Sequence, residues 1–308
     1  MISDRLLILS DGKPGHLNQS IAFAKHLGYD YELRRVAFRG RLAKLISYVA
    51  DRLALHWWWL FSCEKGDGEY FAVVSAGSET YYANRLLAGE LGIKSVAIML
   101  PKGYRYDFDL IVAQHHDAPP LRGNIIPLPV NLSYVVPQGL VKPEFGRKYV
   151  AVIVGGDSKQ GRLVPEQLRE QLRQVFALFP GYGLWLTTSR RTSSEVEDML
   201  RDFDWERAVF YSKEPINPIP DFLAQSDYVF LTADSTSMIS EAVSYGTACV
   251  EVLPASGTAI ASGKFGRMVD DLQKQGAVHI FNGEIGSAHG KINLSSLLSV
   301  AGWALDSQ

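Results

Sequence analysis

Short runs of apolar residues alternate with longer segments of helical periodicity along the chain. Such runs predict buried strands, and apolar residues recurring every three or four positions predict helices. Because most of these strands are continuous apolar runs, we expect parallel sheets covered on both faces. The first half contains the predicted strands Arg5–Leu9, Tyr31–Ala37, Phe71–Ser75, Ser95–Met99, Leu110–Ala113 and Ile125–Leu128, and the predicted helices Leu17–Leu27, Leu42–Trp59 and Glu79–Leu91.

One weakly periodic stretch interrupts this alternation. Residues 127–147 are rich in Pro, Gly and polar residues and predict a linker. The second run contains the predicted strands Tyr149–Val154, Gly183–Thr187, Ala208–Tyr211, Tyr228–Thr232 and Ala248–Val252, and the predicted helices Pro165–Phe179, Ser193–Leu200 and Ile239–Tyr245. We therefore expect an α/β protein of two doubly wound Rossmann-like domains facing a cleft. Their predicted extents are residues 1–140 and 141–308, with the last helix packing back on the first domain.

Composition excludes several classes of protein. The chain has 308 residues, is 47% hydrophobic and 21% charged, and carries a formal net charge of −2, which argues against a nucleic-acid partner. Its two cysteines, Cys63 and Cys249, have no metal-type spacing and indicate a reducing compartment. The N-terminal apolar run predicts a strand rather than a signal peptide, and no transmembrane helix is expected. We expect a cytoplasmic protein, with attachment to the cytoplasmic face of the inner membrane left open.

The turn after the first strand contains residues suited to proton transfer. Gly15 allows a close backbone approach to a ligand, and His16 stands at a helix start. A neutral imidazole accepts a proton near neutral pH, and Asp11 could orient or assist it. A tight turn without catalytic function remains the alternative.

Two turns of the second domain contain residues suited to a diphosphate. Gly155 and Gly156 end a strand and predict backbone amides that face a ligand, followed by Ser158 and Lys159. Another strand is followed by Ser189, Arg190 and Arg191, of which one arginine is expected to face the cleft. Helix capping and surface arginines are the alternative for the second turn.

The richest candidate segment is Ser226–Glu251. It predicts a strand, a turn of small hydroxyl residues and a helix that starts with Ser235, Thr236 and Ser237. A helix start offers unpaired N–H groups to an anion, and Glu241 follows about one turn later. Phosphate at the helix start and a ribose at the carboxylate would form the donor half of a nucleotide-sugar site. A capped helix with a surface acid is the alternative.

The segment Arg39–Phe61 has an amphipathic pattern. Its apolar residues Leu42, Leu45, Ile46, Val49, Leu53 and Trp57 fall on one helical face. Residues 34–52 hold six basic side chains and one acid, Asp51, and Trp57–Trp59 follow. Such a helix can dock on an anionic membrane. Alternatively, its apolar face covers the sheet.

No metal site is predicted. Asp107-Phe108-Asp109 and Asp202-Phe203-Asp204 have the D-x-D spacing of metal-dependent sugar transfer. Both precede strands, away from the ligand-binding strand ends, so we interpret them as surface acids. No cofactor is expected.

The ordered motifs SDGKPGHLNQ, GGDSK, TTSRRT and TADSTSMISEAVSYGT resemble the bacterial relatives of the plant "elongated mitochondria" mitochondrial-fission family. These relatives are often described as glycosyltransferases. The GxxGH turn and the late Ser/Thr-rich turn with its Glu are also similar to GT-B glycosyltransferases, such as the lipid-linked N-acetylglucosaminyltransferase of peptidoglycan synthesis. This resemblance implies that Gly15 and His16 face acceptor and diphosphate, that Ser235–Ser237 bind phosphate, and that Glu241 binds the ribose. A second acid eight residues away, found in some GT-B families, is absent, since Ala233 and Cys249 occupy those positions.

Three functions remain open at this stage. The first is an inverting, metal-independent GT-B glycosyltransferase of cell-envelope synthesis, which moves a sugar from a nucleotide-sugar donor to a glycan or lipid-linked acceptor. The second is a nucleotide-sugar 2-epimerase on the same fold. The third is a non-catalytic membrane-associated scaffold, in which Arg39–Phe61 would be the working part.

Overall fold

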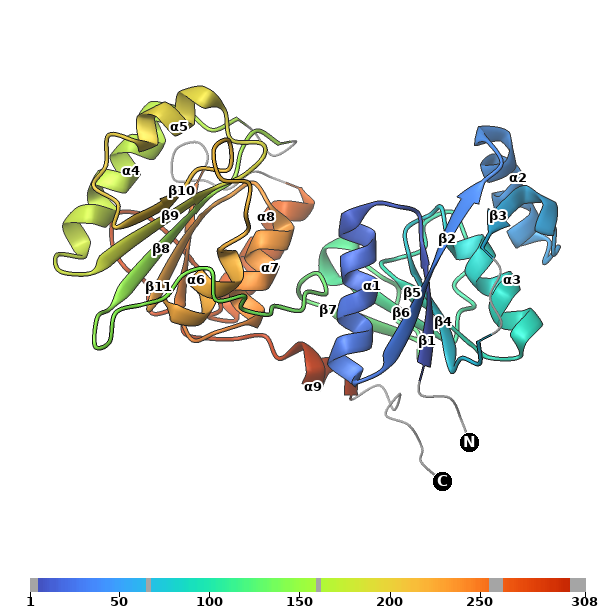
Figure 1. Ribbon diagram of the computed structural model, residues 1–308. Helices are drawn as coiled ribbons and strands as arrows, with labels where there is room; N and C mark the ends of the chain where they lie inside the picture. Colours follow the sequence, from blue (N-terminus) through green and yellow to red (C-terminus); the bar gives the residue numbers. More distant parts are fainter. Residues whose placement is uncertain (1–4, 65–67, 159–161, 255–262, 300–308) are drawn as a thin grey trace. The chain divides into compact units, whose positions relative to one another are not determined.

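The computed structural model describes residues 5–64, 68–158, 162–254 and 263–299 (Figure 1). The chain divides into two compact units. The first runs to Tyr134 and includes the short helix α9 (Leu294–Leu298). The second spans Val135–Ile292. Each unit contains its own mainly parallel sheet.

A seven-stranded sheet forms the first unit, in the order β3-β2-β1-β4-β5-β6-β7. Neighbouring strands are parallel, except that β3 pairs antiparallel with β2. The strand order reverses between β1 and β4, so the turns after these two strands lie side by side. The strands are β1 (Arg5–Ser10), β2 (Asp30–Phe38), β3 (Phe61–Cys63), β4 (Ala72–Ala76), β5 (Lys94–Ile98), β6 (Leu110–Gln114) and β7 (Ile125–Leu128).

Helices cover both faces of this sheet, as the continuous apolar strands predict (Figure 1). Helix α1 (Pro14–Leu27) crosses one face, and α2 (Arg41–Arg52) and α3 (Tyr81–Leu91) lie on the other. Consecutive β1 residues point to opposite faces. Leu7 and Leu9 join the core beneath α3, and both are at most 1% exposed.

Helix α9 packs beside α1 (Figure 1). His26 of α1 makes two polar contacts here: Nδ1 lies 2.9 Å from the Ser295 hydroxyl, and Nε2 lies 2.8 Å from the Ser133 carbonyl oxygen. One imidazole therefore binds the segment that leaves the first unit and the segment that returns to it.

The second unit contains a six-stranded parallel sheet in the order β10-β9-β8-β11-β12-β13. The strand order reverses between β8 and β11, which is where doubly wound sheets bind ligands. Its strands are β8 (Tyr149–Val154), β9 (Gly183–Thr188), β10 (Arg207–Val209), β11 (Tyr228–Thr232), β12 (Cys249–Leu253) and β13 (His279–Ile280). Its helices are α4 (Pro165–Leu178), α5 (Ser194–Leu200), α6 (Ile219–Gln225), α7 (Thr236–Ser244) and α8 (Lys264–Lys274).

Every strand predicted from an apolar run is present, with its ends within two residues of the predicted ones. The prediction did not include the edge strands β3 and β13 or the helices α6 and α8, and it gave no bounds for the last helix, which is α9. Strand β13 has only two residues, so its hydrophobic pattern is too short to indicate a strand. Helix α8 is different, because Phe265, Met268, Val269 and Leu272 have helical spacing and are buried.

The predicted helix Leu42–Trp59 is wrong in its length. Helix α2 ends at Arg52, and Ala54 adopts a positive φ of 54°, which a helix cannot continue through. The Tyr82 hydroxyl then donates to the Leu55 carbonyl oxygen and accepts from the Trp57 N–H, each within 2.9 Å. A 3₁₀ turn, Trp58–Leu60, leads into β3.

The alternative in which the apolar face of α2 covers the sheet is also wrong. The buried residues of α2 are small or polar: Ala43, Ser47, Ala50 and Asp51. Leu42, Leu45, Val49 and Leu53 are instead 58–74% exposed. Of the predicted apolar face, only Ile46 packs against the core, and Asp51 on the buried side pairs with Arg85 inside the unit. Across the ranges that the structure describes, no helix combines the length and apolarity needed to cross a bilayer.

Asp221 of α6 fixes the segment that enters the second unit. Its buried carboxylate accepts hydrogen bonds from the backbone N–H groups of Gln138, Gly139, Leu140 and Val141, at 2.7–3.4 Å. Burial alone would raise the pKa of Asp221, but these four donors hold it below its ordinary value.

Replacing this carboxylate is expected to destabilise the second unit. Asp221→Asn removes charge and leaves two N–H groups with a poorer acceptor, so it should lower the free energy of unfolding by about 2 kcal/mol at neutral pH. Because the pKa of Asp221 is depressed in the folded state, the difference in free energy of unfolding between wild type and Asp221→Asn should shrink as pH falls below about 4. Urea denaturation of both proteins across pH measures this. The exposed Asp198 provides the control, and Asp198→Asn should change stability by less than about 0.5 kcal/mol. Equal stability of Asp221→Asn and wild type would contradict the anchoring role.

Candidate functional site

The turn between β1 and α1 brings Asp11 and His16 together. Pro14 stands in the first turn of α1, where its missing N–H costs nothing, and Gly12 has a φ of 82°. Asp11 is buried, with a 2% exposed side chain, and its Oδ2 lies 2.9 Å from His16 Nδ1. Lys13 adds a backbone hydrogen bond and an ion pair to the same carboxylate, both at 3.1 Å.

This arrangement gives the imidazole a defined orientation. Burial favours the neutral form of Asp11, but the hydrogen bonds from Lys13 and His16 outweigh it and hold the pKa of Asp11 below its ordinary value. An ionised Asp11 accepts a hydrogen bond from Nδ1–H of His16, which leaves Nε2 as the basic nitrogen. The His16 side chain is 24% exposed, so a substrate hydroxyl can reach it.

Gly77, which the sequence analysis missed, forms the wall behind His16. It follows β4, the neighbour of β1, and has a φ of 89°. A Cβ at this position would lie 2.4 Å from both Nδ1 and Cε1 of His16. The sequence did offer a signal for Gly77, because this glycine directly follows a buried strand. Gly15 differs, because a Cβ there would meet open space.

Asp234 joins three turns at the carboxyl edge of the second sheet. It follows β11, and its buried carboxylate accepts from the Thr232 hydroxyl at 2.5 Å and from the Gly156 N–H at 3.1 Å. Arg191, after β9, donates to the same carboxylate at 2.6 Å. The sequence analysis overlooked Asp234, although an acid directly after a buried strand was a visible signal.

The two glycines after β8 have a different role from the predicted one. The Gly155 N–H donates to the Thr232 hydroxyl and the Gly156 N–H to Asp234, so neither amide is turned to a ligand. A Cβ on Gly155 would lie 2.1 Å from the Asp234 carboxylate, and one on Gly156 would lie 2.0 Å from the Arg191 carbonyl oxygen. Both positions require glycine because the three turns pack so closely.

The structure distinguishes the two arginines. Arg191 donates to Asp234 and to the carbonyl oxygens of Gly156 and Asp157, so it holds the turns together. Arg190 is exposed and has no side-chain partner among the described residues, which leaves its guanidinium available to an anion. Ser189 accepts from the Arg191 N–H and so shapes the turn. Ser158 is half-buried nearby in sequence, and Lys159 lies outside the described residues.

Helix α7 presents hydroxyls and an unpartnered acid. Ser235 caps it by accepting from the Met238 N–H, and Thr236 and Ser237 form its first turn. Ser237 is exposed, and Glu241 follows four residues later on the same face. In the part of the chain that the structure describes, the Glu241 carboxyl has no hydrogen-bond or ion-pair partner. Burial raises the pKa of Glu241 to about 7.

Each D-x-D pair of acids lies before a strand of its own unit, β6 or β10, and not at a carboxyl end. Asp107, Asp109, Asp202 and Asp204 are all exposed, as predicted. Three of them already have partners: Asp107 pairs with Arg85, Asp109 accepts from Ser95, and Asp202 pairs with Arg169. Among the described residues, no three His, Cys, Asp or Glu side chains gather as a metal site.

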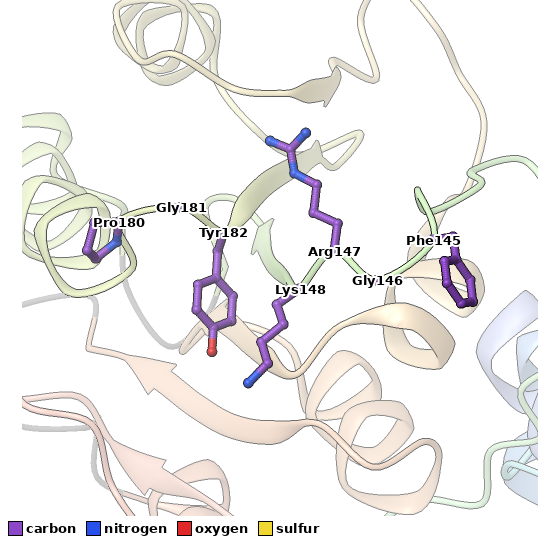
Figure 2. A pocket seen from close by; sticks show the side chains of 7 residues that line it. All are labelled: Phe145, Gly146, Arg147, Lys148, Pro180, Gly181 and Tyr182. Carbon is purple, nitrogen blue, oxygen red and sulfur yellow. The ribbon is translucent and has the colours of Figure 1, made fainter.

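A surface hollow at the opposite edge of the second sheet is not a candidate donor site. It is lined by residues 145–148, before β8, and 180–182, before β9 (Figure 2). Lys148 and Tyr182 run alongside each other there, with the ammonium 5.8 Å from the ring centre. Since doubly wound sheets bind ligands at the carboxyl ends of their strands, we place the candidate site at the turns after β8, β9 and β11.

Comparisons with known proteins agree with this fold. A family model described as "Mitochondrial fission ELM1" matches residues 14–306. Protein RP120 of Rickettsia prowazekii (strain Madrid E), described as uncharacterized, is 27% identical over 146 residues, which span 45% of this chain and only 40% of that protein.

Three solved structures have a similar fold. CalG4, the calicheamicin glycosyltransferase, is 13% identical with a TM-score of 0.51, covering 100% of this chain and 91% of its own. MnaA of S. aureus with UDP is 11% identical with a TM-score of 0.50, and the match covers 98% of this chain and 88% of MnaA. A UDP-N-acetylglucosamine 2-epimerase is 14% identical with a TM-score of 0.50, covering 97% and 94%. At these identities the likeness concerns the fold alone, and it confirms the predicted GT-B class.

The Arg191–Asp234 pair is expected to be strongly coupled. A double-mutant cycle with Arg191→Gln and Asp234→Asn, measured by urea denaturation, should give a coupling energy of about 1–3 kcal/mol. Arg162–Asp157 is the matched control, since both side chains are largely exposed. Its cycle should give about 0.5 kcal/mol or less. Similar coupling in the two cycles would contradict a central role for Asp234.

Glu241 is expected to make stability depend on pH. Its folded pKa is raised, so the folded state binds more protons than the unfolded state between about pH 4.5 and 7, and stability falls as pH rises through that range. In the wild type we expect the free energy of unfolding to fall by roughly 2 kcal/mol between about pH 5 and pH 8, and we expect this fall to be absent in Glu241→Gln. Denaturation at both pH values measures this, with the exposed Glu195→Gln as control. An unchanged pH profile in Glu241→Gln would contradict the raised pKa.

Proposed function

The chain belongs to the mitochondrial fission ELM1 family, and from this premise we propose that it is a GT-B glycosyltransferase that uses a nucleotide-sugar donor. The observation that carries the proposal is the half-buried Glu241 carboxyl, which has no hydrogen-bond or ion-pair partner among the described residues and lies one turn after a hydroxyl-rich helix start. Because this side chain is partly exposed and its oxygens accept no hydrogen bond from the described residues, they are available to the hydroxyl groups of a ligand.

The second unit binds the donor in this proposal. The N-terminus of α7 places backbone N–H groups and the Ser237 hydroxyl at the diphosphate, where the helix dipole also favours negative charge. Glu241, on the same face, accepts hydrogen bonds from the ribose hydroxyls. The raised pKa of Glu241 implies that nucleotide binding strengthens as pH rises through about 7, because only the carboxylate accepts two hydrogen bonds.

His16 is the general base of the proposed reaction. Its Nε2 accepts the proton of the acceptor hydroxyl while Asp11 stabilises the imidazolium. The acceptor oxygen then attacks the anomeric carbon directly, the bond to the diphosphate breaks, and the sugar is transferred with inversion. Arg190 and the start of α7 stabilise the negative charge of the departing nucleoside diphosphate.

These protein charges would make a metal ion unnecessary, and we propose metal-independent transfer. A chelator such as EDTA should then leave turnover unchanged. We further propose that the acceptor is a glycan or lipid-linked glycan of the cell envelope. Support for the envelope comes from the outward apolar face of α2, where Leu42, Leu45 and Val49 are exposed.

The donor can be identified by a thermal-shift screen against UDP-, GDP-, ADP-, TDP- and CMP-sugars, since a ligand of the folded state raises its melting temperature. With the donor found, Glu241→Ala should weaken its affinity by about 10- to 100-fold in calorimetry, because a charged hydrogen-bond acceptor is lost. His16→Asn should retain affinity within about twofold and lower turnover by roughly 10²–10⁴-fold.

The exposed Glu195→Gln is the control for both measurements and should change neither. Unchanged affinity in Glu241→Ala would exclude the assigned donor site. Unchanged turnover in His16→Asn would exclude His16 as the base while leaving the donor site intact.

A second candidate is a nucleotide-sugar 2-epimerase, favoured by the likeness to a protein described by that name. It needs the same donor site and no acceptor. Incubating the donor alone distinguishes the two. Isomerised sugar in that incubation indicates an epimerase. A donor that stays unchanged alone and is consumed only after an acceptor is added indicates a transferase.

A further inference from the structure

Helix α2 turns its apolar side away from the protein. Leu42, Leu45, Val49 and Leu53 are 74%, 61%, 58% and 64% exposed. They are spaced three or four residues apart and so form one continuous stripe. Scattered exposed leucines are ordinary, but a stripe along a whole helix marks an interaction surface.

Three exposed tryptophans follow α2 in the chain. Trp57, Trp58 and Trp59 are 38%, 39% and 56% exposed. The bond from the Trp57 N–H to the buried Tyr82 hydroxyl fixes their backbone. Indole rings combine an apolar body with an N–H donor and are enriched where hydrocarbon meets water. The stripe of α2 and Trp57–Trp59 together are called the docking face below.

Cations border the docking face. Arg39, Arg41 and Arg52 are exposed, and none has an ion-pair partner among the residues described. At 3.6 residues per turn, Arg41 and Arg52 fall beside Leu45, along one edge of the apolar stripe. The acid of this helix, Asp51, is buried and paired with Arg85, so it does not offset them.

We propose that the docking face binds the surface of an anionic phospholipid bilayer, with α2 lying in the plane of the interface. The leucines and tryptophans enter the boundary between headgroups and acyl chains, and the arginines contact lipid phosphates. A second copy of the chain fits less well, because a twofold contact would set the same unpaired arginines against one another.

Vesicle flotation tests this directly and needs no substrate, so its outcome does not depend on the proposed enzymatic function. The full chain should float with vesicles of phosphatidylcholine containing about one third phosphatidylglycerol, and much less with phosphatidylcholine alone. Added salt of about 0.5 M should weaken the anionic binding.

Two variants separate the apolar and ionic contributions. The triple variant Leu42→Ser, Leu45→Ser, Val49→Ser should lower vesicle partitioning at least about tenfold. The triple variant Arg39→Gln, Arg41→Gln, Arg52→Gln should lower binding to anionic vesicles on the order of 100-fold and remove its salt dependence. The control is Leu121→Ser, since Leu121 is 102% exposed outside the docking face.

All three variants alter exposed side chains and should retain the wild-type circular dichroism and melting temperature. Partitioning of the Leu/Val variant equal to wild type would overturn the proposal. Self-association would also overturn the proposal if light scattering without lipid detects it in the wild type and not in the same variant. The docking face would then be an interface between copies of the chain.

Discussion

The carboxylate of Asp234 is the point on which the second unit's ligand-binding edge depends. It follows β11 and accepts from Gly156 after β8, from Arg191 after β9 and from Thr232 at the end of β11, so three separate turns share one buried charge. Gly155 and Gly156 are explained by that contact, since a Cβ on either would collide with Asp234 or the Arg191 backbone. The neighbouring start of α7 and the exposed Arg190 are therefore presented by a rigid edge rather than by loose loops.

The strands could be predicted because each depends on a local apolar run. The Asp234–Arg191 pair could not, since 43 residues separate its members and no spacing rule connects them. The orientation of α2 was equally hidden. Its periodicity identifies an apolar face, but Ala43, Ala50 and the buried Asp51–Arg85 pair decide which side approaches the sheet.

The candidate site was predicted unevenly for a similar reason. Residues that act through their own local turn, such as Asp11 with His16 and Ser235 at the start of α7, lie where the sequence placed them. The amides of Gly155 and Gly156 do not, because their partners come from distant strands. Gly77 shows the same limit in the first unit: its role becomes visible only when the imidazole of His16 is found against it.

The return of the chain to α9 has a consequence for how this protein can be divided. His26 holds Ser133 and Ser295, so the first unit is made of two pieces of sequence and the second is a single uninterrupted piece between them. In genetic terms the second unit is an insertion within the first. Val135–Ile292 can be excised or exchanged as one cassette, whereas a C-terminal deletion that removes α9 damages the N-terminal unit.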